Sequence, residues 1–85
     1  MAKEMEIGEI THYYGKIGVG VVKLSAELKV GDRIHILGHT TDFEQTVDSM
    51  QIEHERVEKA KKGESIGLKV AEHVREGDKV YKIIE

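Results

Sequence analysis

The chain has 85 residues and contains no cysteine, proline or tryptophan. A chain of this length forms one small domain that buries roughly 60% of its unfolded surface, which leaves no room for an active-site domain beside a substrate domain. Thirteen lysines and arginines stand against sixteen aspartates and glutamates, a net charge of −3, and this argues against a polyanion binder held by bulk electrostatics. We expect a single domain over residues 1–85, held together without disulfides, in which residues 1–4 form a flexible N-terminus.

The sequence carries no pattern typical of export or membrane insertion. Its first residues, MAKEMEIGEI, lack a basic region followed by an apolar stretch, and no apolar run approaches the roughly 20 residues of a membrane span. We therefore expect a soluble, cytoplasmic protein without membrane contact. The absence of cysteine fits a reducing compartment but does not establish one.

The first expected strand covers residues 5–14, MEIGEITHYY. Met5 and Ile7 stand at alternate positions and therefore share one face. Because Ile10 falls out of that alternation, we expect a β-bulge near Gly8, where glycine tolerates irregular backbone.

The next stretch, residues 13–24 (YYGKIGVGVVKL), sets three glycines beside a lysine, a composition often found in phosphate-binding loops. A P-loop requires Ser or Thr after its Gly-Lys pair and a helix beyond it, but Ile17 follows Gly15 and Lys16. The dinucleotide fingerprint fails at its third glycine, and both motifs need a βαβ unit. We expect a hairpin turn at Gly15 and a bent second strand, with no GTP bound.

The remaining strands show the same alternation of apolar and polar residues. It is strongest in DRIHILG, residues 32–38, where two isoleucines share one face. Residues 46–57 place Met50 and Ile52 on one face, and residues 65–74 and the C-terminal KVYKIIE also alternate.

One segment competes with this all-strand interpretation. Residues 52–63, IEHERVEKAKKG, contain helix-favouring residues and end in a glycine that could act as a C-cap. Only Val57 and Ala60 are apolar after Ile52, and that stripe is too thin for a packed helix. We expect at most a short helical turn from Val57 to Ala60.

A weak internal repeat places Gly-Asp or Gly-Glu before three strands, at residues 31–32, 63–64 and 77–78. Glycine can adopt positive φ there, and the acid can bond neighbouring amides. Three reversals of one kind indicate many short antiparallel strands in a closed or nearly closed architecture. The expected fold is all-β, a small closed barrel of six or seven antiparallel strands with Greek-key-like connections.

Basic and aromatic residues offer a candidate ligand surface. The densest positive stretch, Arg56 to Lys62, is interleaved with glutamates, so it is either a solvated loop or a patch that contacts phosphate. Tyr13 and Tyr14 should point to opposite faces of their strand, one into the core and the other exposed, where it could stack on a base.

Catalytic and metal chemistry have little support. Five histidines are present, but His35 and His39 flank the end of a strand and diverge, whereas zinc needs convergent ligands. No serine lies in a recognisable G-x-S-x-G or S-x-x-K setting. We expect no enzyme activity, no metal and no cofactor.

Three stretches, residues 28–38, 47–70 and 75–83, together resemble the second domain of translation GTPases such as elongation factor Tu. The resemblance rests on a Lys-x-Gly-Asp reversal before a strand, on QIEHE and GESIG at the family's spacing, and on a last Gly-Asp turn. It implies a six- or seven-stranded barrel without the nucleotide domain, and contact with transfer or ribosomal RNA. The family's aminoacyl pocket corresponds to Gln51, Glu53 and Ser65, where family members often carry Glu, His and Asn.

The opening stretch departs from the translation GTPases. Residues 18–31 run one residue short of the family's register, and Ala26 stands where a glycine is usual. A related barrel is an accessory C-terminal domain of some collagenase-like peptidases, and the resemblance therefore leaves two kinds of partner open.

The first hypothesis is a non-enzymatic module that binds structured RNA. Its expected RNA contacts are Lys16, Lys23, Arg56, Lys59, Lys61, Lys62, Tyr13 and Tyr14. The alternative is a protein-interaction module that docks to a peptidase-like or RNA-modifying enzyme; an exposed apolar patch on the folded domain would favour it.

Overall fold

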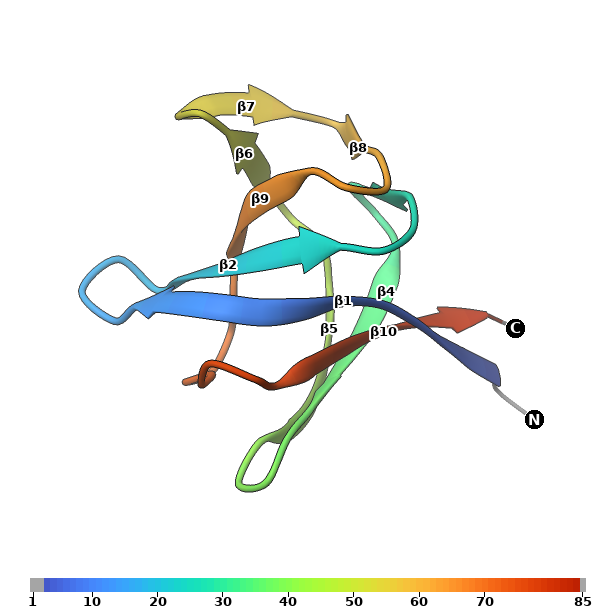
Figure 1. The fold of residues 1–85 in the computed structure, drawn as a ribbon, viewed down its shortest axis with the longest axis vertical. Coiled ribbons are helices and arrows are strands. Elements are labelled where there is room, and N and C mark those ends of the chain that lie inside the picture. Colours follow the sequence, from blue (N-terminus) through green and yellow to red (C-terminus); the bar gives the residue numbers. More distant parts are fainter. Residues whose placement is uncertain (1–2, 85) are drawn as a thin grey trace.

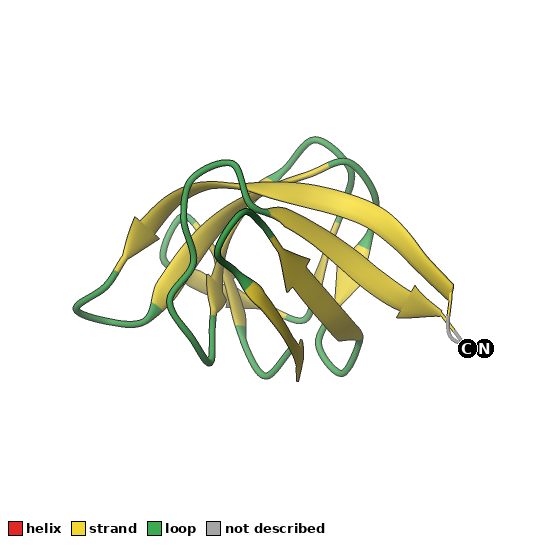
Figure 2. Ribbon diagram, turned by 90° about the horizontal axis from the view of Figure 1, so that it is seen from below, coloured by secondary structure: helices red, strands yellow, loops and turns green. Residues whose placement is uncertain are grey.

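The structure is a computed structural model and describes residues 3–84. Over this range it consists of strands, turns and irregular segments, with no helix (Figures 1 and 2). The strands are β1 (Lys3–Tyr14), β2 (Val19–Leu24), β3 (Leu28–Lys29), β4 (Arg33–Leu37), β5 (Asp42–Thr46), β6 (Met50–Ile52), β7 (Glu55–Val57), β8 (Lys59–Ala60), β9 (Ser65–Lys69) and β10 (Lys79–Ile84).

Eight of these strands form one antiparallel sheet in the order β5-β4-β10-β1-β2-β9-β6-β7, and β3 pairs with β8 separately. The long strand β1 lies between β10 and β2 and pairs with both (Figure 1). Figure 2 shows how strongly this sheet curves, so that one of its faces encloses the core. The all-β, antiparallel prediction is confirmed.

The expected closed barrel of six or seven strands is wrong. The described residues contain ten strands, and the large sheet is open, with β5 at one edge and β7 at the other. The gap beside β5 is crossed by a side chain, because Gln45 bonds the backbone of Lys69 and Ala71 at the end of β9. Alternation within each strand predicts its faces but cannot reveal whether the two edges meet.

The expected helical turn from Val57 to Ala60 is also wrong. Val57 pairs with Met50 in the β6–β7 hairpin, and Ala60 pairs with Leu28 between β8 and β3. Ala60 is fully buried and Val57 packs against the core. These long-range pairings outweigh the local helix propensity of the lysines and glutamates around them.

The core consists of apolar side chains from nearly every strand, with Ile7 and Ile10 of β1 both fully buried. The expected bulge near Gly8 is confirmed, because the pairing of β1 with β10 shifts register between Glu6 and Gly8. Ile7 and Ile10 are three residues apart and would face opposite sides of a regular strand; the register shift lets both point into the core. Met5, which precedes the bulge, is 44% exposed.

The three glycine reversals share one geometry. Gly31, Gly63 and Gly77 all have positive φ, from 91° to 97°. In each reversal the following acid accepts a hydrogen bond from the backbone N–H three residues before it, at 3.0 Å for Asp32, 2.7 Å for Glu64 and 2.9 Å for Asp78. The predicted role of glycine and acid in these turns is confirmed.

The N-terminal segment expected to be flexible is described only in part. Lys3 and Glu4 belong to β1 and pair with Ile84 and Ile83 of β10, whereas residues 1–2 lie outside the described range. Within residues 3–84, no helix has the length and apolar character needed to cross a membrane.

Candidate functional site

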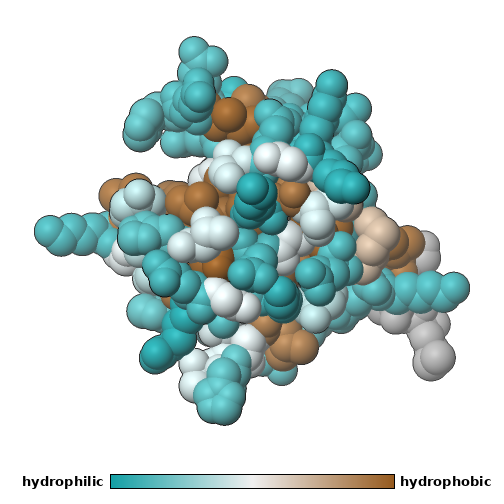
Figure 3. Space-filling model, in the orientation of Figure 1, coloured by the Kyte–Doolittle hydropathy of each residue, from teal (hydrophilic) through white to brown (hydrophobic). Residues whose placement is uncertain are grey.

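A surface groove of about 250 Å³ lies between the β1–β2 turn and the β6–β7 turn. In Figure 3 it opens at the upper left as a notch below the lobe that carries β6 and β7, and brown atoms gather along its lower side. We call this the β2–β9 groove, because residues of these two strands line it.

One wall of the β2–β9 groove is apolar. It comprises Tyr14 at the end of β1, Ile17 in the turn, and Val19 and Val21 on β2. Val19 and Val21 point away from the core because the alternate residue Val22 is fully buried. Tyr14 is 50% exposed and Ile17 61% exposed, so this wall presents apolar surface to solvent.

The floor of the groove is open because residue 67 is a glycine. Gly67 pairs with Val21 on one side and with Gln51 on the other. A Cβ atom at this position would lie 3.4 Å from Val19 Cγ1, so any larger side chain would occupy the space above the floor. Glycine in a strand interior commonly marks such a place of close approach.

The opposite wall is polar and is formed by Gln51, Ser65 and the two residues of the β6–β7 turn, Glu53 and His54. Both turn residues have positive φ, 51° for Glu53 and 67° for His54. A two-residue hairpin with this geometry normally uses Asn-Gly, because at positive φ the Cβ atom crowds the backbone, a penalty that glycine avoids and asparagine tolerates. The turn is therefore strained, and its strain lies at the edge of the groove.

The structure brings together all three positions that the resemblance assigned to a pocket, since Gln51, Glu53 and Ser65 line the same groove. The apolar wall and the glycine floor were not predicted from the sequence. Two patterns could have revealed them. Valines occupy both faces of β2, whereas a half-buried strand should be polar on its outer face. In β9, Gly67 leaves the outer face without a side chain between Ser65 and Lys69.

The basic residues expected to contact RNA do not form one cluster. Lys16 lies in the β1–β2 turn, at the opposite end of the molecule from β8 and the turn after it, which carry Lys59, Lys61 and Lys62 (Figure 1). Lys59 also pairs with Glu27 at 3.5 Å. The exposed Arg56 lies on β7.

Lys23 and the two tyrosines complete the set. Lys23 is exposed on β2 and lines a second, shallow pocket of about 250 Å³ with Glu9. Tyr13 packs against the core, its ring 4.6 Å from that of His73, whereas the exposed Tyr14 ring lies 4.4 Å from His12. The expectation that the tyrosines face opposite ways is confirmed; a role of these eight residues in binding RNA stays a prediction.

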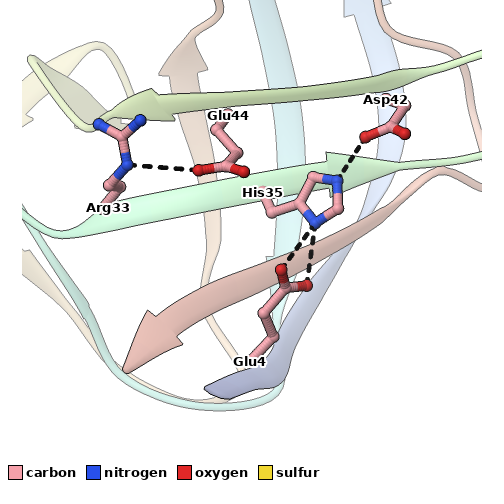
Figure 4. A network of polar contacts seen from close by, with 5 residues as sticks. All are labelled: Glu4, Arg33, His35, Asp42 and Glu44. Carbon is pink, nitrogen blue, oxygen red and sulfur yellow. Dashed lines mark hydrogen bonds and ion pairs between the residues drawn. The ribbon is translucent and has the colours of Figure 1, made fainter. Parts of the chain in front are cut away.

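His35 forms a separate polar network between β1, β4 and β5 (Figure 4). Its Nδ1 lies 2.9 Å from Glu4 Oε1, and its Nε2 lies 2.6 Å from Asp42 Oδ1. Both nitrogens can donate only when the ring is protonated. The hydrogen bond to Asp42 has the larger effect and that to Glu4 the next, and both raise the pKa of His35 above its ordinary value of 6.5. The two nitrogens of His35 face different carboxylates, so these three side chains do not converge on one point. Among residues 3–84, no group of three or more His, Cys, Asp or Glu side chains is arranged to hold a metal ion.

Comparison with known proteins relates this domain to part of larger chains. No protein-family model matches. The chain is 48% identical over 84 residues to an uncharacterized protease of Methanocaldococcus jannaschii, an alignment that covers 98% of this chain and 21% of that protein. It is 38% identical over 82 residues to a collagenase of Porphyromonas gingivalis, covering 94% of this chain and 20% of that one. The chain thus spans about a fifth of the length of the curated relatives it matches.

Two solved structures of a domain from a larger protein have the same fold as this chain. The C-terminal domain of a putative U32 peptidase from Geobacillus thermoleovorans superposes with a TM-score of 0.85 at 16% identity, over 89% of this chain and 96% of that domain. A second structure of that domain gives a TM-score of 0.84 at 18% identity, over 89% of each chain. This chain has the fold of that domain.

The identification of the chain as a translation-factor barrel is therefore wrong, and its RNA-binding hypothesis is supported less well than the alternative. Its relatives carry the names of proteases and collagenases, and its structural neighbours are domains of a putative U32 peptidase. The prediction relied on the Gly-acid turns and on the spacing of the QIEHE and GESIG segments. Such turns and spacings recur in small β domains of different function, so they do not identify a family. The peptidase-associated alternative fits these findings better.

Proposed function

We propose that this chain is a non-catalytic accessory module that docks to a peptidase-like enzyme. The observation that carries the proposal is the 48% identity to a segment amounting to 21% of a protein named as a protease. The match covers 21% of that protein, so most of that protein's length has no counterpart in these 85 residues. This chain acts instead by binding the body of such an enzyme.

The β2–β9 groove supports docking as the mode of action. An exposed apolar wall in a domain of this size is typical of an interaction surface. Tyrosine and aliphatic side chains, as at Tyr14 and Ile17, are suited to the buried centre of an interface.

A catalytic role for the same groove has weaker support. Ser65 and His54 both line it, but a serine nucleophile needs its hydroxyl bonded to a base. The hydrogen bonds among residues 3–84 do not include one between these two side chains.

The proposal is tested by capture followed by reconstitution. The tagged full chain is recovered from its source cells, bound proteins are identified by mass spectrometry, and any peptidase-like protein is purified and titrated by calorimetry. We expect equimolar binding that Ile17→Ser weakens by about ten-fold or more. Leu37→Ser, which removes an exposed side chain outside the groove, should bind normally. Recovery of RNA alone, or a purified enzyme that does not bind, would contradict docking.

A further inference from the structure

We infer that the β2–β9 groove takes an extended segment of the partner in which an apolar side chain stands next to a lysine or arginine. This inference rests on the proposed docking function and adds the chemistry of what is docked. It follows from three properties of the groove: its apolar wall, its charge and its size.

The apolar side chain of the partner packs against Val19, Val21 and Gly67. The valines offer half-buried aliphatic surface, and the glycine leaves room directly beside them. Ile17, on the turn above, is exposed enough to cover an inserted side chain from one side. Removing these surfaces from water together stabilises the complex in proportion to the apolar area buried.

The lysine or arginine of the partner forms an ion pair with Glu53. Among the residues that line the groove, Glu53 is the only aspartate or glutamate, and no lysine or arginine lines it. Glu53 has no ion pair with another residue of the range 3–84. The exposed ring of Tyr14 offers a second surface that attracts cations. A phosphate backbone would meet repulsion here, so charge complementarity favours a basic peptide over RNA.

The position of Glu53 is set by the strained turn. With φ of 51° at Glu53 and 67° at His54, the hairpin holds both side chains at the rim of the groove in a conformation that residues other than glycine rarely adopt. The volume of about 250 Å³ is below the range of pockets that enclose whole small molecules. A groove of this size suits one or two side chains of a peptide.

Four synthetic peptides of about eight residues test the inference, identical except for a central Ile-Arg, Ile-Glu, Ser-Arg or Ser-Glu. Each is titrated into the isotope-labelled full chain while the amide shifts of Val21, Glu53 and Gly67 are followed. We expect the Ile-Arg peptide to bind with a Kd of about 1 mM or tighter, and about three- to five-fold more tightly than the Ile-Glu peptide. The Ser-Arg peptide should also bind more weakly than Ile-Arg, because it lacks the apolar contact.

Variants of the chain separate the two contacts. Glu53→Gln should weaken the Ile-Arg peptide by about three- to five-fold and leave the Ile-Glu peptide unchanged or tighter. Glu55→Gln, on β7 outside the groove lining, should have no effect. Gly67→Val should abolish binding by filling the floor, and Ile17→Ser provides a second apolar variant if the first does not fold.

The results that would overturn the inference are specific. Equal affinity for Ile-Arg and Ile-Glu, or no shift at the groove up to several times the expected Kd, would reject a basic-apolar segment. Groove shifts that depend on the concentration of the chain alone would identify a second copy as the occupant, and shifts caused by a short RNA would identify nucleic acid. If the peptides fail but the purified peptidase-like enzyme binds, only this inference falls and the docking function stands.

Discussion

The side chain of Gln45 links the edge strand β5 to the backbone of Lys69 at the end of β9. Its Nε2 donates to the Lys69 carbonyl oxygen at 2.8 Å, and its Oε1 accepts from the Ala71 N–H at 2.7 Å. A primary amide carries the same donor and acceptor as a peptide group. One side chain thus supplies two bonds where the sheet leaves β5 without a neighbouring strand.

Replacing Gln45 should loosen this connection. Gln45→Ala removes both bonds, and we expect the free energy of unfolding to fall by about 1–2 kcal/mol, measured by urea denaturation. Gln51→Ala, which removes an exposed glutamine from β6, should change it by less than about 0.5 kcal/mol. A Gln45 variant as stable as the Gln51 variant would show that the link contributes nothing.

The glycine reversals make a second prediction. Gly31, Gly63 and Gly77 have positive φ, and, apart from their own chain neighbours, no atom lies within 4 Å of a Cβ placed on any of them. Alanine there meets no obstacle from the rest of the fold, so its effect reports the local backbone conformation alone. Each substitution should cost about 1 kcal/mol of unfolding free energy.

Gly15→Ala is the matched control for the reversals. Gly15 also lies in a turn, but it is not among the glycines with positive φ, and a Cβ there would make an ordinary contact of 3.4 Å with the Tyr13 ring. Its unfolding midpoint in urea should stay close to that of the original chain. Equal losses at all four glycines would point to a cause other than positive φ.

The His35 network predicts a pH dependence of stability. Hydrogen bonds to Asp42 and Glu4 raise the pKa of His35 in the folded chain. The stabilisation is therefore fully present below the unfolded pKa of about 6.5, and it is lost as pH rises through the higher folded pKa. Relative to the original chain, His35→Gln should lose about 0.5–1 kcal/mol near pH 5.5 and less near pH 9.

Denaturation of both chains at the two pH values measures this difference, and high salt should reduce it. His39→Gln, at an exposed position outside this network, should show no such change with pH. A deficit of equal size at both pH values would mean that the charge on His35 does not stabilise the fold.

The strained β6–β7 turn predicts a conflict between stability and docking. His54 has φ of 67°, a conformation that glycine adopts without penalty. His54→Gly should raise the unfolding free energy by about 0.5–1 kcal/mol, measured by thermal and urea denaturation. Affinity for the docked partner should fall, because a more flexible turn holds Glu53 less firmly. A stabilised variant with unchanged affinity would show that the strain has no part in binding.

Some of the fold follows from residues near in sequence. The alternation around Ile34 and Ile36 predicts a strand with both isoleucines buried, and the structure has it. The Gly-Asp and Gly-Glu pairs predict their own turns, because positive φ and a capping acid involve only four consecutive residues. Local pattern also predicts opposite faces for Tyr13 and Tyr14.

Other expectations failed where distant residues decide the outcome. The segment from Val57 to Ala60 has helix-favouring neighbours, yet its pairing with Met50 and Leu28 makes it extended. The β2–β9 groove could be predicted only in part. Three of its polar positions came from a resemblance, but its apolar and polar walls lie on two hairpins far apart in the sequence, and only the tertiary fold places those hairpins beside each other.

An all-β domain of antiparallel strands with glycine-acid reversals could be predicted from the chain alone, since each of these features depends on the alternation of side chains or on a single turn. The tertiary fold was needed to see that the sheet stays open and that the side chain of Gln45 crosses its gap. It was also needed to see that Glu53, Val21 and Gly67 line one groove. These features depend on contacts between residues far apart in the chain, whose energies are not encoded in any local pattern.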